Sequence, residues 1–260
     1  SSVATAAAMS NIAYPEMRKF DYSPKLAAGT IAGGGTLGFL IPPSIGFVVF
    51  GMLTEQSVGK LLIAGILPGL ILALTFIVLI ILMVKRKPGL APINPDPVSW
   101  REKLLSLKNV WEILLAFLVV MGGIYLGWFT PSEAGAAGAT LLFLIALFKR
   151  KLTFKNLFAA LQESVRVSAM VLFLIAGATV FTYFLGLSTI PTQLVEWVAG
   201  LAVSRYLILT AILLVYLILG CFIDAVSMMI LTLPVVFPLI LQLGFHPIAF
   251  GVLCVLMMDA

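Results

Sequence analysis

The apolar positions of this chain form long hydrophobic runs separated by short polar loops. A helix needs about 20 mostly apolar residues to cross a bilayer. Four runs approach that length: Lys60–Val84, Val110–Trp128, Ala134–Phe148 and Ser168–Leu187. Five more are shorter, or are interrupted by glycine and proline: Ser2–Pro15, Pro24–Leu53, Tyr206–Gly220, Ala225–Leu241 and Pro247–Met258. The pattern predicts an all-α integral membrane protein in which several helices are broken or too short to span.

Composition supports this fold class. Hydrophobic residues make up 62% of the 260 positions and charged residues only 10%, against about a quarter charged in soluble domains. One soluble core could not bury so much apolar surface. Both ends of the sequence lie in segments that look interrupted, so we expect further elements of a longer chain before Ser1 and after Ala260.

The basic residues predict the orientation. All of the 16 lysines and arginines except Lys60 and Arg205 fall in three loops, within residues 18–25, 85–108 and 149–166. Because basic loops stay on the cytoplasmic side, we expect a multi-pass protein of a bacterial or archaeal cytoplasmic membrane. Three amphipathic segments are predicted to lie along the membrane surface: Trp100–Val110, Thr153–Arg166 and Thr189–Leu201.

Two segments near the ends of the chain resemble each other. Pro15 and Pro24 are nine residues apart, as are Pro238 and Pro247, and an aromatic residue precedes the first proline of each pair. The loop of the first copy is basic, whereas the loop of the second has no lysine or arginine. The copies are therefore predicted to have opposite orientations. Inverted repeats with interrupted helices are typical of secondary transporters, whose binding sites lie where the repeats meet.

Each copy is interpreted as a re-entrant hairpin followed by a broken helix. The tip of the second hairpin is predicted at Gly220–Ser227, and that of the first at Ser1–Thr5, with its incoming arm before residue 1. The first broken helix carries the sequence GGGTLGFLIPPS from residue 33 to residue 44. We expect Gly33–Gly38 to be its unwound midpoint, with the proline pair that follows beginning the second half-helix.

Backbone that is not helical can lie at membrane depth only where it is buried in protein or lines a water-filled cavity. Its free carbonyl groups suit a hard cation such as sodium, and its amides suit an anion. Asp224 and Ser227 add a carboxylate and a hydroxyl at the second tip, while the first tip offers hydroxyls. An ionisable residue inside a membrane is a functional candidate; the alternative for Asp224 is a helix cap.

No catalytic constellation accompanies these features. The sequence has no HExxH motif, nucleotide-binding loop, paired catalytic carboxylates or Cys/His ligand cluster. We therefore expect a protein that is not an enzyme, with no organic cofactor and no nucleic-acid partner, and with energy drawn from an ion gradient or from another chain. Three alternatives remain open: an anion channel or passive pore, a membrane enzyme acting on lipids, and a scaffold subunit that does not transport.

Several long motifs, in order, resemble one family. The segments SSVATAAAM, GGGTLGFLIPPS, FTPSEAGAAGA and GCFIDAVSMMILTLPVVFPLILQLGFHPIAFGV are similar to the large membrane subunit of tripartite ATP-independent periplasmic (TRAP) transporters, along essentially the whole sequence. The resemblance implies an inverted-repeat, elevator-type, sodium-coupled importer of small organic anions such as C4-dicarboxylates, sialic acid or related carboxylates and sulfonates. It also implies a periplasmic binding protein, a small (Q-type) membrane subunit and surrounding lipid as partners.

The resemblance further implies site residues and a division of the chain. Sodium would bind where each hairpin tip meets a broken helix, at Ser1, Ser2, Thr5, Gly35, Thr36, Gly38 and Asp224. Substrate would lie between the tips, at Ser2, Thr36, Pro42, Ser44 and Ser227. Residues 1–87 and 205–260 would form the transport domain, and residues 88–204 the scaffold and arm helices.

Overall fold

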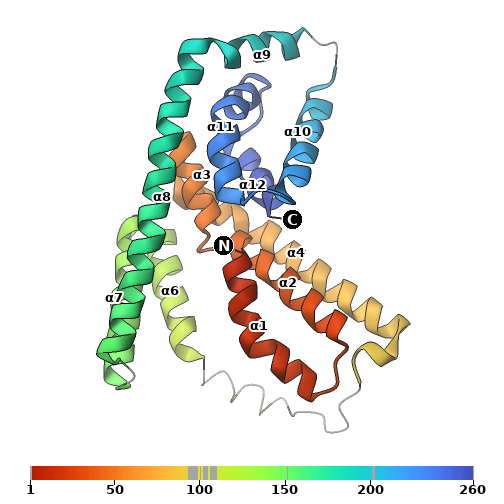
Figure 1. Cartoon of the computed structure of the whole chain (residues 1–260), viewed down its shortest axis with the longest axis vertical. Helices are drawn as coiled ribbons and strands as arrows, with labels where there is room; N and C mark the ends of the chain where they lie inside the picture. Colours follow the sequence, from red (N-terminus) through yellow and green to blue (C-terminus); the bar gives the residue numbers. More distant parts are fainter. Residues whose placement is uncertain are drawn as a thin grey trace. The chain divides into compact units, whose positions relative to one another are not determined.

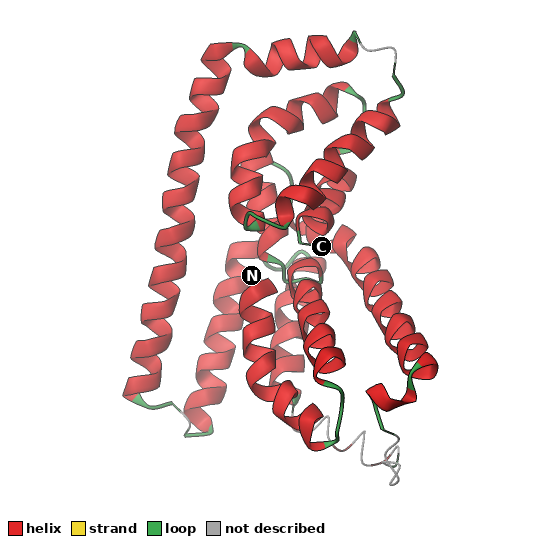
Figure 2. Cartoon of the chain, turned by 45° about the vertical axis from the view of Figure 1, so that its right-hand side comes forward, coloured by secondary structure: helices red, strands yellow, loops and turns green. Residues whose placement is uncertain are grey.

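The computed structural model describes residues 2–92, 99, 101, 105, 110–150, 152–200 and 203–259, with the backbone alone at 2–4, 191, 194, 195 and 199. Every regular element in these parts is a helix (Figure 2), which confirms the predicted all-α class. Five of the helical segments are long and apolar enough to cross a membrane: Pro24–Thr54, Val58–Arg86, Pro131–Phe148, Phe154–Ser188 and Ala225–Gln242.

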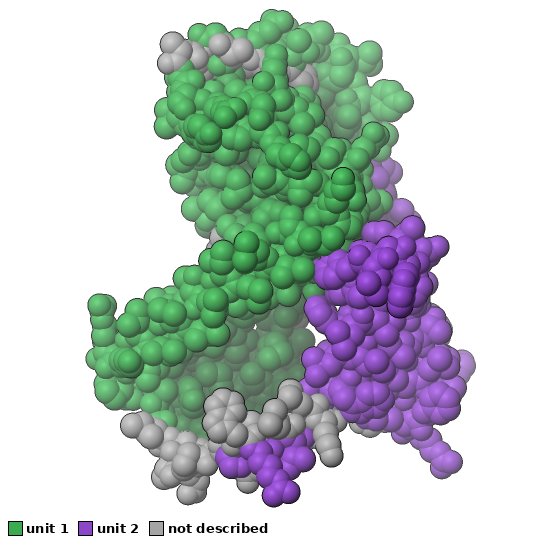
Figure 3. All heavy atoms as spheres, turned by 180° about the vertical axis from the view of Figure 1, so that it is seen from behind, with its two compact units in different colours: residues 1–94, 178–260 green, residues 95–177 purple. Residues whose placement is uncertain are grey.

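The described helices follow one another as drawn in Figure 1. They are α1 (Ser2–Lys19), α2 (Pro24–Leu40), α3 (Ile45–Thr54), α4 (Val58–Arg86), the 3-10 helix η1 (Pro88–Leu90), α6 (Trp111–Tyr125), α7 (Pro131–Phe148), α8 (Phe154–Ser188), α9 (Ile190–Ala199), α10 (Arg205–Gly220), α11 (Ala225–Gln242) and α12 (Pro247–Met258). The chain divides into two compact units, coloured in Figure 3. Unit 1 joins residues 1–94 with 178–260, and unit 2 is residues 95–177.

The two similar segments form matching helices in unit 1. Helices α1 and α11 are both 18 residues long, and each carries its internal proline, Pro15 or Pro238, at the same position. Helices α2 and α12 both begin on a proline, Pro24 or Pro247. Each counterpart lies 223 residues after its partner. The spacing that the prolines indicate therefore also relates both bounds of α1 and α11 and the first residues of α2 and α12.

The break in the first repeat lies later than the glycines predict. Helix α2 runs through Gly33–Gly38 and ends at Leu40, and the backbone leaves the helix at Ile41, with φ −77° and ψ 126°. Pro42–Pro43 is a cis peptide. A residue before proline is driven out of the helical region, whereas a glycine only lowers helix stability, by about 1 kcal/mol. The prediction of an unwound midpoint at Gly33–Gly38 is therefore wrong.

The core of unit 1 is an aromatic cluster in which both repeats take part. Phe47 and Phe50 of α3 are fully buried. The ring of Phe50 meets Phe237 of α11 edge to face, with centroids 5.9 Å apart, and Phe250 of α12 at 6.2 Å. Such pairs contribute about 0.5–1.5 kcal/mol beyond the area they bury. The second half of the broken helix is thus packed into the second repeat.

Helix α4 approaches the break closely because of two glycines on one face. A Cβ at Gly65 would overlap the ring of Phe47 and lie 3.2 Å from the carbonyl oxygen of Leu40. A Cβ at Gly69 would lie 2.8 Å from Cγ1 of Ile41. Small residues let helix backbones come close together in membranes. The glycine pair of α4 therefore fixes the position of the break.

In unit 2, α6 and α7 form a helical pair that an ion pair joins. Helix α7 begins with a capping box: the backbone amide of Glu133 donates to the hydroxyl of Thr130, whose own amide donates to the Glu133 carboxylate. At the other end, Lys149 after α7 pairs with Glu112 in the first turn of α6, whose side chain is only 14% exposed. The sequence analysis did not predict this ion pair.

The three amphipathic segments that were predicted to lie along the membrane surface differ from one another in the structure. Trp100–Val110 lies mainly outside the described residues. Thr153–Arg166 forms no separate surface helix, because α8 continues without a turn to Ser188. The third segment is a separate helix, α9, which lies across the end of α8 (Figure 1) after a left-handed residue, Thr189, at φ 57°.

Candidate ion and substrate site

Ser44 holds the two halves of the broken helix together. Its side chain is 1% exposed. The hydroxyl donates to the carbonyl oxygen of Phe39 at the end of α2 and accepts from the amide of Phe47 at 3.4 Å, in the first turn of α3. Among the predicted substrate residues, Ser44 and the buried Pro42 are thus parts of the break itself. Their contact with substrate stays a prediction.

Thr5, which was predicted to lie in the first hairpin tip, is part of α1, and its side chain lies against α2. A Cβ built at Gly38 would lie 3.2 Å from Oγ1 of Thr5 and 3.3 Å from its Cγ2. Two residues predicted to share a sodium site are therefore neighbours. Of the others, Ser1 lies outside the described residues, Ser2 is described by its backbone alone, and Gly35 is buried inside α2.

A cavity of about 370 Å³ lies beside Thr36 in unit 1. The Thr36 hydroxyl donates to the carbonyl oxygen of Gly33 at 2.8 Å. The walls come from α2, α4 and α12, and from Asp259 directly after α12: Ala32, Gly33, Thr36, Leu40, Leu72, Phe76, Val255, Leu256 and Asp259. Most of this lining is apolar, and Thr36 and Asp259 bring hydroxyl and carboxylate groups to it.

Residues at equivalent positions of the two similar segments line this cavity. Three pairs of lining residues are separated by 223 residues, the spacing that relates Pro24 to Pro247. The pairs are Ala32 with Val255, Gly33 with Leu256, and Thr36 with Asp259. Asp259 was not among the predicted site residues. The repeat spacing could have identified it, because that spacing makes it the counterpart of Thr36.

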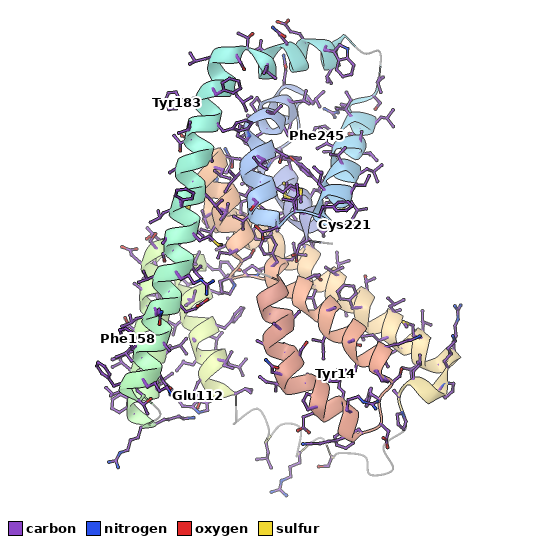
Figure 4. All side chains as sticks on the ribbon, in the orientation of Figure 1. Tyr14, Glu112, Phe158, Tyr183, Cys221 and Phe245 are labelled. Carbon is purple, nitrogen blue, oxygen red and sulfur yellow. The ribbon has the colours of Figure 1, made fainter. Side chains whose placement is uncertain are left out.

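The second hairpin tip forms as predicted, between α10 and α11, and Figure 4 marks it with Cys221. Asp224 caps α11: its Oδ2 accepts from the amide of Ser227 at 3.0 Å and from the Ser227 hydroxyl at 3.1 Å. The carboxylate is exposed. A Cβ at Gly220 would lie 3.0 Å from the carbonyl oxygen of Met258, so the tip meets the end of α12. Neither Asp224 nor Ser227 lines the cavity described above.

The polar side chains that line the cavity are the hydroxyl of Thr36 and the carboxylate of Asp259. Hydroxyls, a carboxylate and the carbonyl groups at helix ends, which have no partner within their helix, are the ligands that hard cations prefer. Within the described residues, no three histidine, cysteine, aspartate or glutamate side chains form a metal-binding cluster. The arrangement can hold a small hard ion or a small polar molecule against apolar walls.

Known proteins resemble this chain along its whole length. Residues 1–260 match the family described as the tripartite ATP-independent periplasmic transporter, DctM component. The chain is 38% identical over 260 residues to the C4-dicarboxylate TRAP transporter large permease protein of Pseudomonas aeruginosa, covering 100% of this chain and 60% of that protein. It is 30% identical over 257 residues to the sialic acid TRAP transporter large permease protein of Vibrio cholerae, covering 98% and 60%.

A third relative is the isethionate TRAP transporter permease protein DctMQ of Oleidesulfovibrio alaskensis, 32% identical over 259 residues, covering 98% of this chain and 40% of that protein. The chain thus spans about 60% of the length of the large permeases it matches. All three relatives carry the names of transporter permeases, which agrees with the expectation of a protein that is not an enzyme. From the match along all 260 residues and the apolar helices that accompany it, the chain belongs to the DctM family of TRAP transporter components.

Proposed function

We propose that the chain is part of a sodium-coupled importer of small organic anions in a cytoplasmic membrane. The observation that carries the proposal is the cavity beside the helix break, to which the two repeats contribute Thr36 and Asp259 at equivalent positions. Repeat interfaces with broken helices are where secondary transporters bind substrate. The relatives are named for C4-dicarboxylate, sialic acid and isethionate, and we expect a substrate of this class.

Two sodium sites would lie where a hairpin tip meets a helix end. The first would use the hydroxyls of the α1 tip with carbonyl groups near Gly38, and the contact between Thr5 and Gly38 supports it. The second would use Asp224, and the approach of Gly220 to the carbonyl of Met258 supports it. An exposed carboxylate among helix ends suits a cation that must bind and leave in every cycle.

Transport would follow an elevator mechanism, in which the packed repeats move as one body against a scaffold. The aromatic cluster around Phe50 supports movement of the repeats as one body, because it joins α3 to α11 and α12. Opposite orientation of the repeats is supported by Figure 1, where α1 and α11 both start near the marked chain ends and run in opposite directions. The cytoplasmic loops would be the basic ones.

Two protein partners belong to the proposal. A periplasmic binding protein would deliver the anion, and a small membrane subunit would brace the scaffold. The description of the family as a component of a tripartite periplasmic transporter supports both.

Uptake by the complete complex tests the proposal. The full-length permease with its small subunit is reconstituted in liposomes, with the binding protein outside, and a panel of carboxylates and sulfonates is offered with and without an inward sodium gradient. We expect saturable uptake of one class of anion that stops when the gradient is collapsed. Flux that neither saturates nor responds to sodium would instead identify a passive pore and contradict the proposal.

A further inference from the structure

Helices α2 and α4 enclose an apolar groove that adjoins the cavity beside Thr36 and shares Gly33 and Phe76 with its lining. Two adjoining cavities, of about 240 and 340 Å³, follow the two helices and share Lys25, Leu26 and Met83 as walls. We call them together the α2–α4 groove. The remaining apolar lining includes Gly29 of α2 and Phe76 of α4.

The depth of the groove comes from missing side chains on α2. A Cβ at Gly29 would meet no atom within 4 Å, and one at Gly33 would meet only the ring of Phe76, at 3.6 Å. On α4 the walls are exposed, with Leu79 at 50% and Met83 at 43%. In a membrane helix, exposed apolar side chains contact lipid chains. The groove beside them has the apolar walls that an acyl chain needs.

One end of the groove carries positive charge. Its lining ends at Lys25, Arg86 and Lys87, all exposed. Within the described parts of the chain, none of these three cations has a carboxylate partner. The amide of Ser23 donates to the carbonyl oxygen of Leu90 at 2.8 Å, which fastens the end of η1 to the start of α2 and keeps the basic residues together.

We propose that the α2–α4 groove binds an anionic phospholipid. One acyl chain lies along Gly29 and Phe76, and the phosphate lies among Lys25, Arg86 and Lys87. Basic pockets between membrane helices on the cytoplasmic side select anionic head groups, each lysine or arginine strengthening the attraction about fivefold. A soluble anion would satisfy the charges but leave the apolar trough unfilled. The site does not depend on the proposed transport function.

The test uses the full-length permease complex, stripped of lipid in detergent and titrated with phosphatidylglycerol or phosphatidylcholine of the same chain length, with binding read by native mass spectrometry. One variant, Lys25→Gln/Arg86→Gln/Lys87→Gln, removes the charges. A second, Gly29→Leu, fills the trough. Its matched control is Gly34→Leu, because a Cβ at Gly34 also meets no atom within 4 Å but Gly34 does not line the groove. Lys60→Gln, near the start of α4, controls for charge.

The wild-type complex is expected to prefer phosphatidylglycerol by about a hundredfold, from three charges at about fivefold each. The triple variant should lose that preference, and Gly29→Leu should weaken the binding of both lipids. Both control variants should behave as wild type. Equal affinity of the wild type for the two lipids would overturn the proposal, and so would equal losses in Gly29→Leu and Gly34→Leu.

Discussion

Thr36 and Asp259 lie 223 residues apart in the sequence and line the same cavity from equivalent positions of two repeats. Thr36 belongs to α2, whose hydrogen bonding continues past it to Leu40, and Asp259 follows the last residue of α12. A threonine in one repeat therefore corresponds to an aspartate in the other. The proposed site would therefore be asymmetric, with a hydroxyl on one side and a carboxylate on the other.

Asp224 is both a helix cap and a proposed sodium ligand, and two substitutions separate these roles. Asparagine caps a helix about as well as aspartate, whereas alanine costs about 1 kcal/mol. We expect Asp224→Asn to keep the thermal stability of the complex and Asp224→Ala to lower it. Both should lose sodium-driven uptake, measured in proteoliposomes. Full uptake by Asp224→Asn would show that the residue is only a cap.

Thr5 packs so closely against Gly38 that a methyl group added at Gly38 would crowd the Thr5 side chain. A Cβ at Gly38 would press on both Oγ1 and Cγ2 of Thr5, so Gly38→Ala should push the hairpin away from α2. We expect sodium-driven uptake to fall about tenfold, as a shift of this kind costs about 1–3 kcal/mol. Thr5→Ser in the same protein removes the methyl group and keeps the hydroxyl.

Partial recovery of uptake in the Gly38→Ala/Thr5→Ser double variant is the expected control result. A double variant no better than Gly38→Ala alone would argue against this contact as the cause.

Gly65 sets the distance between α4 and the helix break. A Cβ there would overlap the Phe47 ring, and overpacking of this kind costs about 1–3 kcal/mol. Gly65→Ala should lower the unfolding midpoint of the purified complex. Gly122→Ala is the matched control, because a Cβ at Gly122 meets nothing within 4 Å; there alanine should be neutral or stabilising. Equal midpoints for the two variants would contradict the proposed role of Gly65.

The pair of Glu112 and Lys149 predicts an asymmetric effect of removing either partner. Side-chain exposure is 14% for Glu112 and 43% for Lys149. Removing the lysine leaves a largely buried carboxylate without its partner, at a cost of about 3 kcal/mol, whereas the more exposed lysine tolerates loss of the glutamate better. Thermal unfolding should therefore show a larger loss for Lys149→Met than for Glu112→Gln. The reverse order would contradict the burial argument.

Much of this fold could be predicted from the sequence, because membrane helices are determined by local apolarity and charge. The prolines at 15, 24, 238 and 247 indicated the repeat, and its spacing relates both bounds of α1 and α11 and the starts of α2 and α12. The turn before Asp224 lies within the predicted tip. The Thr130 capping box could likewise be predicted, because both of its residues lie in one turn of sequence.

Tertiary contacts determine the features that sequence reasoning missed. Glycine composition indicated unwinding at residues 33–38, yet packing against α1 and α4 keeps that segment helical and the steric effect of Pro42 places the break. The ion pair of Glu112 with Lys149 joins residues that no local pattern relates. The presence of Asp259 in the same cavity as Thr36 can be predicted only by matching the two repeats residue by residue.

We propose that the two repeats together form the site that couples sodium to transport. It is tested most directly by the sodium dependence of uptake in a double-mutant cycle with Thr36→Val and Asp259→Asn, in proteoliposomes holding the complete complex. Groups that share one site couple by at least about 0.5 kcal/mol. We predict that both single variants raise the sodium concentration for half-maximal uptake, and that the double variant departs from additivity by that amount or more. A wild-type sodium dependence in all three variants would contradict the account.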